Sequence, residues 1–242
     1  MSGPAFVAGA SGYTGQAVVS ELLAAGIDTV AHIRPNSSRL EELRGRFVQQ
    51  GAQVDTTPWE DEAMGATFER LQPSYVFALL GITRASAAKE AKRNPEVGAI
   101  NYERIDYGLT AMLIRSTEGI EPPPRFVYLS SLGVTDKRPG NAYLLARWKV
   151  EKQLAQSGLP YTVARPSFVS GSDREEFRPG ERIATRVGDA LLGLGAKLGA
   201  GKMKARYGSL SAKELAAALV RLALDPKAAR QIFEADRLRA TG

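Results

Sequence analysis

The stretch that decides the fold lies near the start of the chain and reads Ala5-Phe6-Val7-Ala8-Gly9-Ala10-Ser11-Gly12-Tyr13-Thr14-Gly15. Its apolar first part predicts a buried strand, and apolar residues at helical spacing predict a helix from Thr14 to Ala25, ended by Gly26. A second strand is expected from Thr29 to Ile33, so the chain opens with a β-α-β unit. A glycine-rich turn inside such a unit is typical of dinucleotide binding.

The three glycines of this turn have separate roles. Gly9 permits the tight turn, Gly12 lets the backbone approach a pyrophosphate, and Gly15 lets the helix pack closely on the strand. The start of the helix adds N–H donors and a favourable dipole for phosphate groups. The expected cofactor contacts in the turn are Gly9, Ser11, Gly12, Tyr13, Thr14 and Gly15.

The residue that follows the second strand predicts which dinucleotide is preferred. Enzymes that prefer NAD usually carry an acidic residue there, whereas this chain has Arg34. Guanidinium and hydroxyl donors suit a 2′-phosphate, so we expect NADP(H), with a solvated surface arginine as the alternative. Asp55 is expected beside the adenine, or else acts as a simple turn residue. The predicted contacts on this side are Arg34, Ser37, Ser38, Arg39, Asp55 and Thr56.

Strand and helix continue to alternate along the chain, which predicts a parallel sheet. The expected strands cover residues 52–54, 75–79, 125–129 and 161–164, and the expected helices cover 38–49, 60–71, 85–116 with an interruption near Pro95, and 141–156. Arg165-Pro166 is expected to close the sheet, because proline cannot donate to a ladder. The predicted fold class is α/β: a doubly wound, mostly parallel sheet of the Rossmann type, with the cofactor across the carboxyl ends of the strands.

The C-terminal part is less regular and predicts a cap over a substrate cleft. A capping box at Ser211-Ala212-Lys213-Glu214 predicts a helix that ends near Leu224. Residues 167–210, together with residues 84–95, are expected to form the cap. We therefore expect one domain over residues 1–242 with a small C-terminal substrate cap.

Composition narrows the possible functions. The chain has 242 residues, of which 44% are hydrophobic and 24% are charged, as in soluble globular proteins. It has no cysteine, which excludes disulfide scaffolds, thiolate metal sites and cysteine catalysis. Its one histidine, His32, lies in a predicted strand, so no histidine-based triad or multi-histidine metal site is expected.

Charge and hydropathy also bear on partners and location. The net charge of +6 comes without a run of like charges or a nucleic-acid-binding motif, so a solvated basic surface is expected and nucleic acid is not. The chain shows neither a signal peptide nor a stretch long and apolar enough to span a membrane, which favours a cytoplasmic location.

Later segments complete a wider pattern with the glycine turn. They are Leu80-Gly81-Ile82-Thr83-Arg84, Asp106-Tyr107, Phe126-Val127-Tyr128-Leu129-Ser130-Ser131-Leu132-Gly133, Tyr143-Leu144, Arg165-Pro166 and the loop from Asp173 to Glu181. With these segments the chain resembles, over nearly its full length, the atypical short-chain dehydrogenase superfamily. Within it, the chain resembles the Tat-interacting-protein-like oxidoreductases, and the loop is the most specific element of that resemblance.

The resemblance implies a set of catalytic residues. Ser131, or its neighbour Ser130, corresponds to a serine that polarises a carbonyl, and Tyr143 corresponds to the general acid of a Tyr-x-x-x-Lys pair. The sequence departs from that pair, because Arg147 stands four residues after Tyr143 and on the same helical face. An arginine keeps the positive charge and could hold ribose hydroxyls, but it cannot relay a proton. Further cofactor contacts are implied at Leu80, Gly81, Thr83, Tyr143, Arg147, Pro166 and Ser167.

Two functions remain open at this point. The first is an NADP(H)-dependent oxidoreductase that transfers a hydride to or from a small carbonyl or alcohol substrate in an apolar cleft. The second is an NADPH-binding redox sensor or scaffolding protein with little turnover, which would bind a protein partner or form a homo-oligomer. The second is motivated by Arg147, by the regulatory partners associated with the resembled family, and by the basic, apolar tail.

The loop from Asp173 to Glu181 follows the predicted strand 161–164 and is expected over the reacting centre. Gly171 and Gly180 could serve as hinges, so a lid that orders on ligand binding is one interpretation. A static polar turn is the other.

Overall fold

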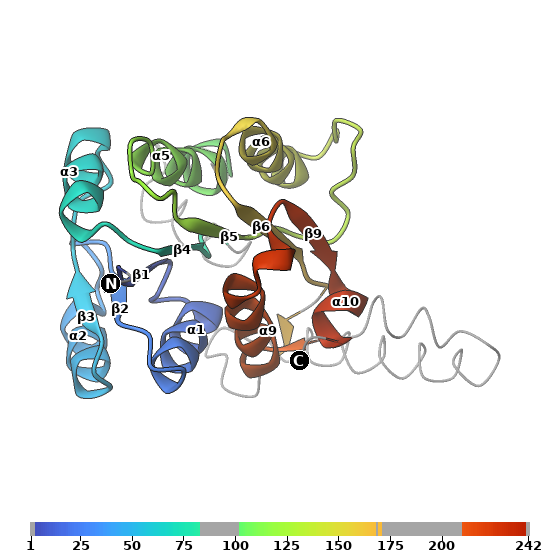
Figure 1. Ribbon diagram of the computed structural model, residues 1–242. Helices are drawn as coiled ribbons and strands as arrows, with labels where there is room; N and C mark the ends of the chain where they lie inside the picture. Colours follow the sequence, from blue (N-terminus) through green and yellow to red (C-terminus); the bar gives the residue numbers. More distant parts are fainter. Residues whose placement is uncertain (1–2, 83–101, 168, 171–209, 241–242) are drawn as a thin grey trace.

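The computed structural model describes residues 3–82, 102–167, 169–170 and 210–240. Its centre is a seven-stranded sheet in which every pairing is parallel, with the strand order β3-β2-β1-β4-β5-β6-β9 (Figure 1). The strands are β1 (Ala5–Ala8), β2 (Thr29–His32), β3 (Gln53–Asp55), β4 (Tyr75–Ala78), β5 (Arg125–Leu129), β6 (Tyr161–Arg165) and β9 (Gln231–Glu234). β7 (Val169–Ser170) and β8 (Leu210–Ser211) form a separate parallel pair.

Helices cover both faces of the sheet, so the sheet has an apolar layer on each side (Figure 1). One face carries α1 (Tyr13–Ala24), α2 (Leu40–Gln49), α9 (Ala212–Leu224) and α10 (Ala235–Ala240), and the other carries α3 (Asp61–Leu71), α5 (Leu109–Ser116) and α6 (Ala142–Gln156). Two short helices are η2 (Glu103–Gly108), of the π type, and the 3₁₀ helix η3 (Pro226–Ala228). Alternate residues of β1 show the division, since Val7 packs in one layer and Phe6 in the other.

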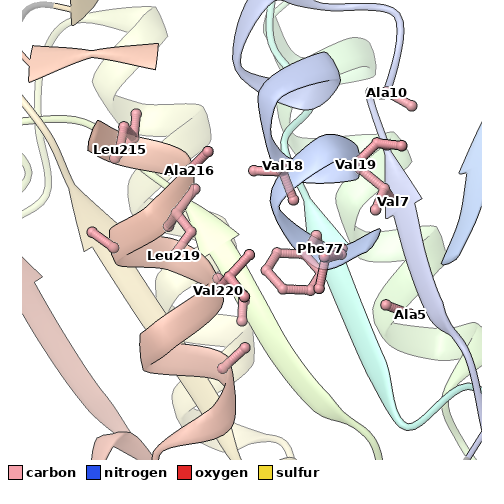
Figure 2. Close-up of a cluster of buried hydrophobic side chains, with 14 of the residues drawn as sticks. Ala5, Val7, Ala10, Val18, Val19, Phe77, Leu215, Ala216, Leu219 and Val220 are labelled. Atoms are coloured by element: carbon pink, nitrogen blue, oxygen red, sulfur yellow. The ribbon is translucent and has the colours of Figure 1, made fainter. Parts of the chain in front are cut away.

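Helix α9 fixes the position of α1. Figure 2 shows Val18 of α1 facing Ala216 and Leu219 of α9, with Phe77 of the sheet beneath them. All of these side chains are buried. The contact holds the start of α1, and therefore the glycine turn, at the carboxyl ends of the strands.

The glycine turn has the geometry that the sequence predicts. Gly9 has φ +86° and its carbonyl oxygen accepts a hydrogen bond of 3.0 Å from the backbone N–H of Gly12. A Cβ on Gly15 would lie 2.1 Å from that carbonyl oxygen, so only glycine lets α1 approach the turn this closely. The predicted packing role of Gly15 is confirmed.

Most of the predicted elements are confirmed, with ends that differ by one or two residues. The capping box predicted at Ser211 and Glu214 is present at the start of α9. The expectation that Arg165-Pro166 closes the sheet is wrong, because β9 pairs with β6 as far as Arg165, whose partner is Glu234. The proline lies just beyond the ladder and does not block it. The segment Gln231–Glu234 is short and does not alternate between polar and apolar residues, so its sequence gives no strong strand signal.

Several predicted features lie outside the described residues. These are the region near Arg84 and Pro95, most of the predicted cap, and the loop from Asp173 to Glu181. In the part of the chain that the structure describes, no helix is long and apolar enough to cross a bilayer.

Candidate active site

A cleft of about 460 Å³ opens at the carboxyl ends of β1, β4, β5 and β6. It brings together residues predicted from the glycine turn and residues predicted for the reacting end. The predicted residues that line it are Gly12, Tyr13, Thr14, Gly15, Leu80, Gly81, Ser130, Ser131, Tyr143, Arg147, Pro166 and Ser167. The cleft therefore joins the predicted phosphate-binding and reacting ends in one space.

Other predicted residues lie elsewhere. Gly9 and Ser11 belong to the turn but not to the lining. The remaining predicted residues do not line the cleft and lie after β2 or at the end of β3: Arg34, Ser37, Ser38, Arg39, Asp55 and Thr56. Thr83 is outside the described residues. Val169, which belongs to the predicted cap, also lines the cleft. The sequence analysis missed further lining residues, namely Leu79, Ile82, Tyr102, Leu129 and Asn141.

The start of α1 forms one wall of the cleft. Its N-cap, Gly12, has no side chain to satisfy the first backbone N–H groups, and the first turn of the helix carries no acidic residue. A Cβ on Gly9 would lie 2.8 Å from the carbonyl oxygen of Leu79, so the turn also fits closely against the end of β4. Backbone N–H groups at a helix start without a capping side chain, on the wall of a cleft, fit the pyrophosphate of a dinucleotide.

Arg147 forms the floor of the cleft near α6. Its guanidinium donates to Asp106 Oδ1 from NH2 at 2.7 Å and to the Leu129 carbonyl oxygen from NH1 at 2.6 Å. Asp106 is fully buried, and its second oxygen accepts a hydrogen bond of 3.3 Å from the Ile82 N–H. Arg147 and Asp106 thus connect α6, η2 and the chain segments that follow β4 and β5.

The charge of Arg147 is permanent. Burial by itself lowers the pKa of Arg147, but the electrostatic effect of Tyr128, Tyr143 and Asp106 is larger and leaves it above its usual value. Burial raises the pKa of Asp106, and Arg147 opposes that effect. Burial also raises the pKa of Tyr128, whose hydroxyl lies 3.4 Å from Arg147 NH1. Arg147 therefore stays positively charged and does not act as an acid or a base near neutral pH.

Tyr143 lies in the first turn of α6, where Asn141 sets the start of the helix. The Asn141 side chain accepts hydrogen bonds from the backbone N–H groups of Tyr143 and Leu144, at 2.9 and 3.3 Å. The Tyr143 ring has the Arg147 guanidinium carbon 5.3 Å from its centroid and the Tyr102 ring 5.3 Å away, edge to face. The i, i+4 relation predicted for Tyr143 and Arg147 is thus a direct contact.

The two candidate serines have different surroundings. Ser130 is buried, and its hydroxyl donates to Glu151 Oε1 at 2.5 Å. Glu151 is held in turn by Arg165, through bonds of 3.1 Å from Nε and 2.5 Å from NH2. Ser131 is half-buried, and its hydroxyl donates only a longer bond, 3.2 Å, to the Leu132 carbonyl oxygen. Ser130 is committed to a buried ion pair, whereas Ser131 can turn to a ligand.

At the end of β3, Asp55 is engaged within its own turn. Its carboxylate accepts hydrogen bonds from the N–H and the hydroxyl of Thr57, at 3.1 and 2.9 Å. This geometry matches the alternative of a turn residue, and a contact with adenine stays a prediction.

The described part of the chain contains no group of His, Cys, Asp and Glu side chains that could hold a metal ion. Among the described residues, the groups lining the cleft that can take part in chemistry include the Tyr143 and Ser131 hydroxyls, the Arg147 cation and the N-terminus of α1.

A parallel sheet in this strand order, with a glycine turn and a helix N-terminus at its carboxyl edge, defines a Rossmann-type dinucleotide-binding protein. The chain belongs to the NAD(P)H-binding family, whose sequence profile matches residues 9–191. Binding of a nicotinamide dinucleotide, predicted from the glycine turn, agrees with this membership.

Solved structures with the same fold include several enzymes. A Bacillus halodurans protein described as an NAD-dependent epimerase/dehydratase is 19% identical, with a TM-score of 0.64 over 99% of this chain and 100% of that one. ChuY, an anaerobillin reductase from Escherichia coli O157:H7, is 18% identical, with a TM-score of 0.62 over 95% of each chain. UDP-glucose 4-epimerase from Brucella ovis, in complex with NAD, is 16% identical, with a TM-score of 0.66 over 96% of this chain and 77% of that one.

These similarities confirm the predicted fold and agree with the predicted resemblance to the atypical short-chain dehydrogenase superfamily. The closer resemblance to the Tat-interacting-protein-like oxidoreductases stays a prediction.

Proposed function

We propose that the protein is an NADP(H)-dependent oxidoreductase that acts on a carbonyl or alcohol group of a small substrate. The observation that carries the proposal is that Ser131, Tyr143 and Arg147 line the same cleft as the N-terminus of α1. Nucleotide binding and proton chemistry can therefore take place side by side. The fold shared with ChuY, a reductase, supports the same class of reaction.

The residues that would hold the cofactor lie in two groups. The first turn of α1 would bind the pyrophosphate through backbone N–H groups, and Leu80 and Gly81 would lie along the other wall. Arg34, Ser37, Ser38 and Arg39 would bind the 2′-phosphate of NADP(H) beyond the end of β2. The nicotinamide of the bound cofactor would supply or accept the hydride.

The chain's own groups would handle the substrate oxygen. In reduction, the Ser131 hydroxyl would donate a hydrogen bond to the substrate carbonyl, and the Tyr143 hydroxyl would deliver the proton. Arg147 would keep a positive charge beside the Tyr143 ring as the negative charge on the oxygen develops. Its high pKa gives it an electrostatic role and excludes a role as proton donor.

The experiment is NADPH oxidation with a panel of small aldehydes and ketones, followed for the wild type and for Tyr143→Phe. We expect the substitution to lower kcat by about 10²- to 10⁴-fold, the usual contribution of a general acid. Tyr107→Phe is the control, because Tyr107 lies in η2 and contacts Lys149 without lining the cleft. Full activity of Tyr143→Phe would show that the proton comes from another group.

A second candidate function is an NADPH-binding sensor or scaffold with little turnover. It is favoured by the position of Arg147, whose terminal nitrogens are engaged by Asp106 and the Leu129 carbonyl oxygen. Arg147→Lys separates the two functions. Substantial turnover only in this variant would favour the sensor, whereas turnover of a carbonyl by the wild type would favour the enzyme.

A further inference from the structure

The first turn of α2 holds a carboxylate between two arginines. Glu42 accepts hydrogen bonds from Arg39 Nε at 3.0 Å, from Arg39 NH2 at 3.1 Å and from Arg46 NH2 at 3.1 Å. The three side chains are between 41% and 50% exposed. A ligand in solution can therefore reach both guanidinium groups.

This trio is connected to the glycine turn. Arg46 NH1 donates to Gln16 Oε1 at 2.6 Å, and Gln16 Nε2 donates to the Ser11 carbonyl oxygen at 3.2 Å. Gln16 lies in the first turn of α1. The side chains around Glu42 therefore stand beside the same helix start that would bind the pyrophosphate.

The trio is also connected to the loop that follows β2. The Ser37 N–H donates to the Arg34 carbonyl oxygen at 3.1 Å, and the Arg39 N–H donates to the Ser37 hydroxyl oxygen at 3.3 Å. Arg39 is thus held at the far end of the loop that begins with the exposed Arg34. In this fold the adenosine ribose of a dinucleotide lies against that loop.

The charges on the trio bear directly on a phosphate. The hydrogen bond from Arg39 holds the pKa of Glu42 below its usual value, so the carboxylate is ionised at neutral pH. A 2′-phosphate is also an anion, and it would accept hydrogen bonds from the same Nε and NH2 groups of Arg39 that now donate to Glu42. The two anions cannot occupy those donors at the same time.

We propose that Glu42 is a specificity-determining residue that competes with the 2′-phosphate of NADP(H) for Arg39. The proposal rests on the proposed function only in placing a dinucleotide on the glycine turn. A cofactor without the phosphate leaves the pair of Glu42 and Arg39 intact. The preference for NADP(H) over NAD(H) is then the difference between two anionic partners of one arginine.

The test is the affinity of NADPH, NADH and 2′,5′-ADP for the wild type, Glu42→Gln and Glu41→Gln, measured by calorimetry in low salt. Removing one partner of a solvent-exposed ion pair changes an affinity by at most about fivefold. We expect Glu42→Gln to bind NADPH and 2′,5′-ADP about two- to fivefold more tightly than the wild type, and NADH with less than about twofold change.

Glu41→Gln is the matched control, because it makes the same change of charge on the same helix turn. Its carboxylate is 83% exposed and lies 3.7 Å from Arg44, away from Arg39. We expect it to alter none of the three affinities by more than about twofold. Adding Arg39→Gln to Glu42→Gln should remove the gain in affinity for the two ligands that carry a 2′-phosphate, NADPH and 2′,5′-ADP.

Two results would overturn the competition. An unchanged affinity of Glu42→Gln for NADPH would show that the phosphate does not use Arg39, and a weaker affinity would show that Glu42 holds the arginines in a productive position. The proposed NADP(H) preference is tested separately by the wild type. Equal wild-type affinities for NADPH and NADH, with a gain in Glu42→Gln, would remove that preference and support the competition.

Discussion

In the lining of the cleft, the Arg147 guanidinium fills the position that a side chain on Gly81 would need. A Cβ on residue 81 would lie 2.4 Å from Arg147 NH2, and the guanidinium is held by Asp106 and the Leu129 carbonyl oxygen. We expect Gly81→Ala to lower the free energy of unfolding by about 1–3 kcal/mol, the usual cost of overpacking, and to weaken NADPH binding. Urea unfolding and NADPH titration measure the two effects.

The control for this substitution is Gly65→Ala in α3. A Cβ there would meet no atom within 4 Å, and alanine is the better helix former. We expect Gly65→Ala to raise the free energy of unfolding by about 0.5–1 kcal/mol. A similar gain for Gly81→Ala would contradict this overlap with Arg147.

Removing one partner of the buried pair of Asp106 and Arg147 should lower the free energy of unfolding more than replacing both partners. Asp106→Ala leaves the Arg147 guanidinium buried without its carboxylate, and removing one partner of such a pair costs about 3–5 kcal/mol. Replacing both, with Asp106→Ala and Arg147→Met, should recover most of that loss. Glu103→Gln, which breaks the exposed pair of η2 and α6 with Lys149, should cost at most about 1 kcal/mol. A cost for Asp106→Ala no larger than this would mean that the pair is not held tightly.

His32 should make the protein less stable as the pH falls. Its ring is buried beside Phe6 and Trp59, and burial lowers the pKa of His32 below its usual value of 6.5. The unfolded chain therefore takes up the proton first. The stabilising contribution is complete above pH 6.5 and is lost as the pH falls through the lower folded value.

One measurement follows from the presence of a single histidine in the chain. Its imidazole proton resonance can be assigned without ambiguity, and its titration midpoint should lie below 6.5. His32→Gln should show a smaller loss of stability between about pH 7 and about pH 5. A midpoint at or above 6.5 would contradict the effect of burial.

Substitution of Ser130 should mainly lower stability, whereas substitution of Ser131 should mainly lower activity. Ser130→Ala removes a hydrogen bond to the buried Glu151 carboxylate and should cost about 1–3 kcal/mol of stability. Ser131→Ala should leave stability nearly unchanged and lower kcat by about 10²-fold, because a donor to the developing oxyanion is lost. Unfolding and NADPH oxidation of the two variants check this; the reverse pattern would assign the substrate contact to Ser130.

The parts of the fold that depend on local chemistry could be predicted from the sequence. The roles of Gly9 and Gly15 follow from the turn itself, and the cap of α9 follows from Ser211 and Glu214. The contact of Tyr143 with Arg147 follows from their helical spacing. In each case, the atoms that determine the structure lie within a few residues of one another.

Contacts between distant segments could not be predicted in the same way. Asp106 and Arg147 are 41 positions apart, and the sequence does not say that a π-helix brings the carboxylate to α6. Ser130 differs from Ser131 because its hydroxyl donates to Glu151, 21 positions later in the chain. Each of these contacts depends on how whole elements pack.

The last strand also has a consequence for how the chain is made. β6 is complete only when β9 pairs with it, and the Thr162 hydroxyl finds its acceptor, the Ala228 carbonyl oxygen, 66 positions later. During synthesis on the ribosome, β6 emerges with an open edge, and α1 emerges before α9, the helix against which it packs. Such an edge can pair with another chain. The edge of β6 therefore stays without its partner strand until residues 231–234 have left the exit tunnel.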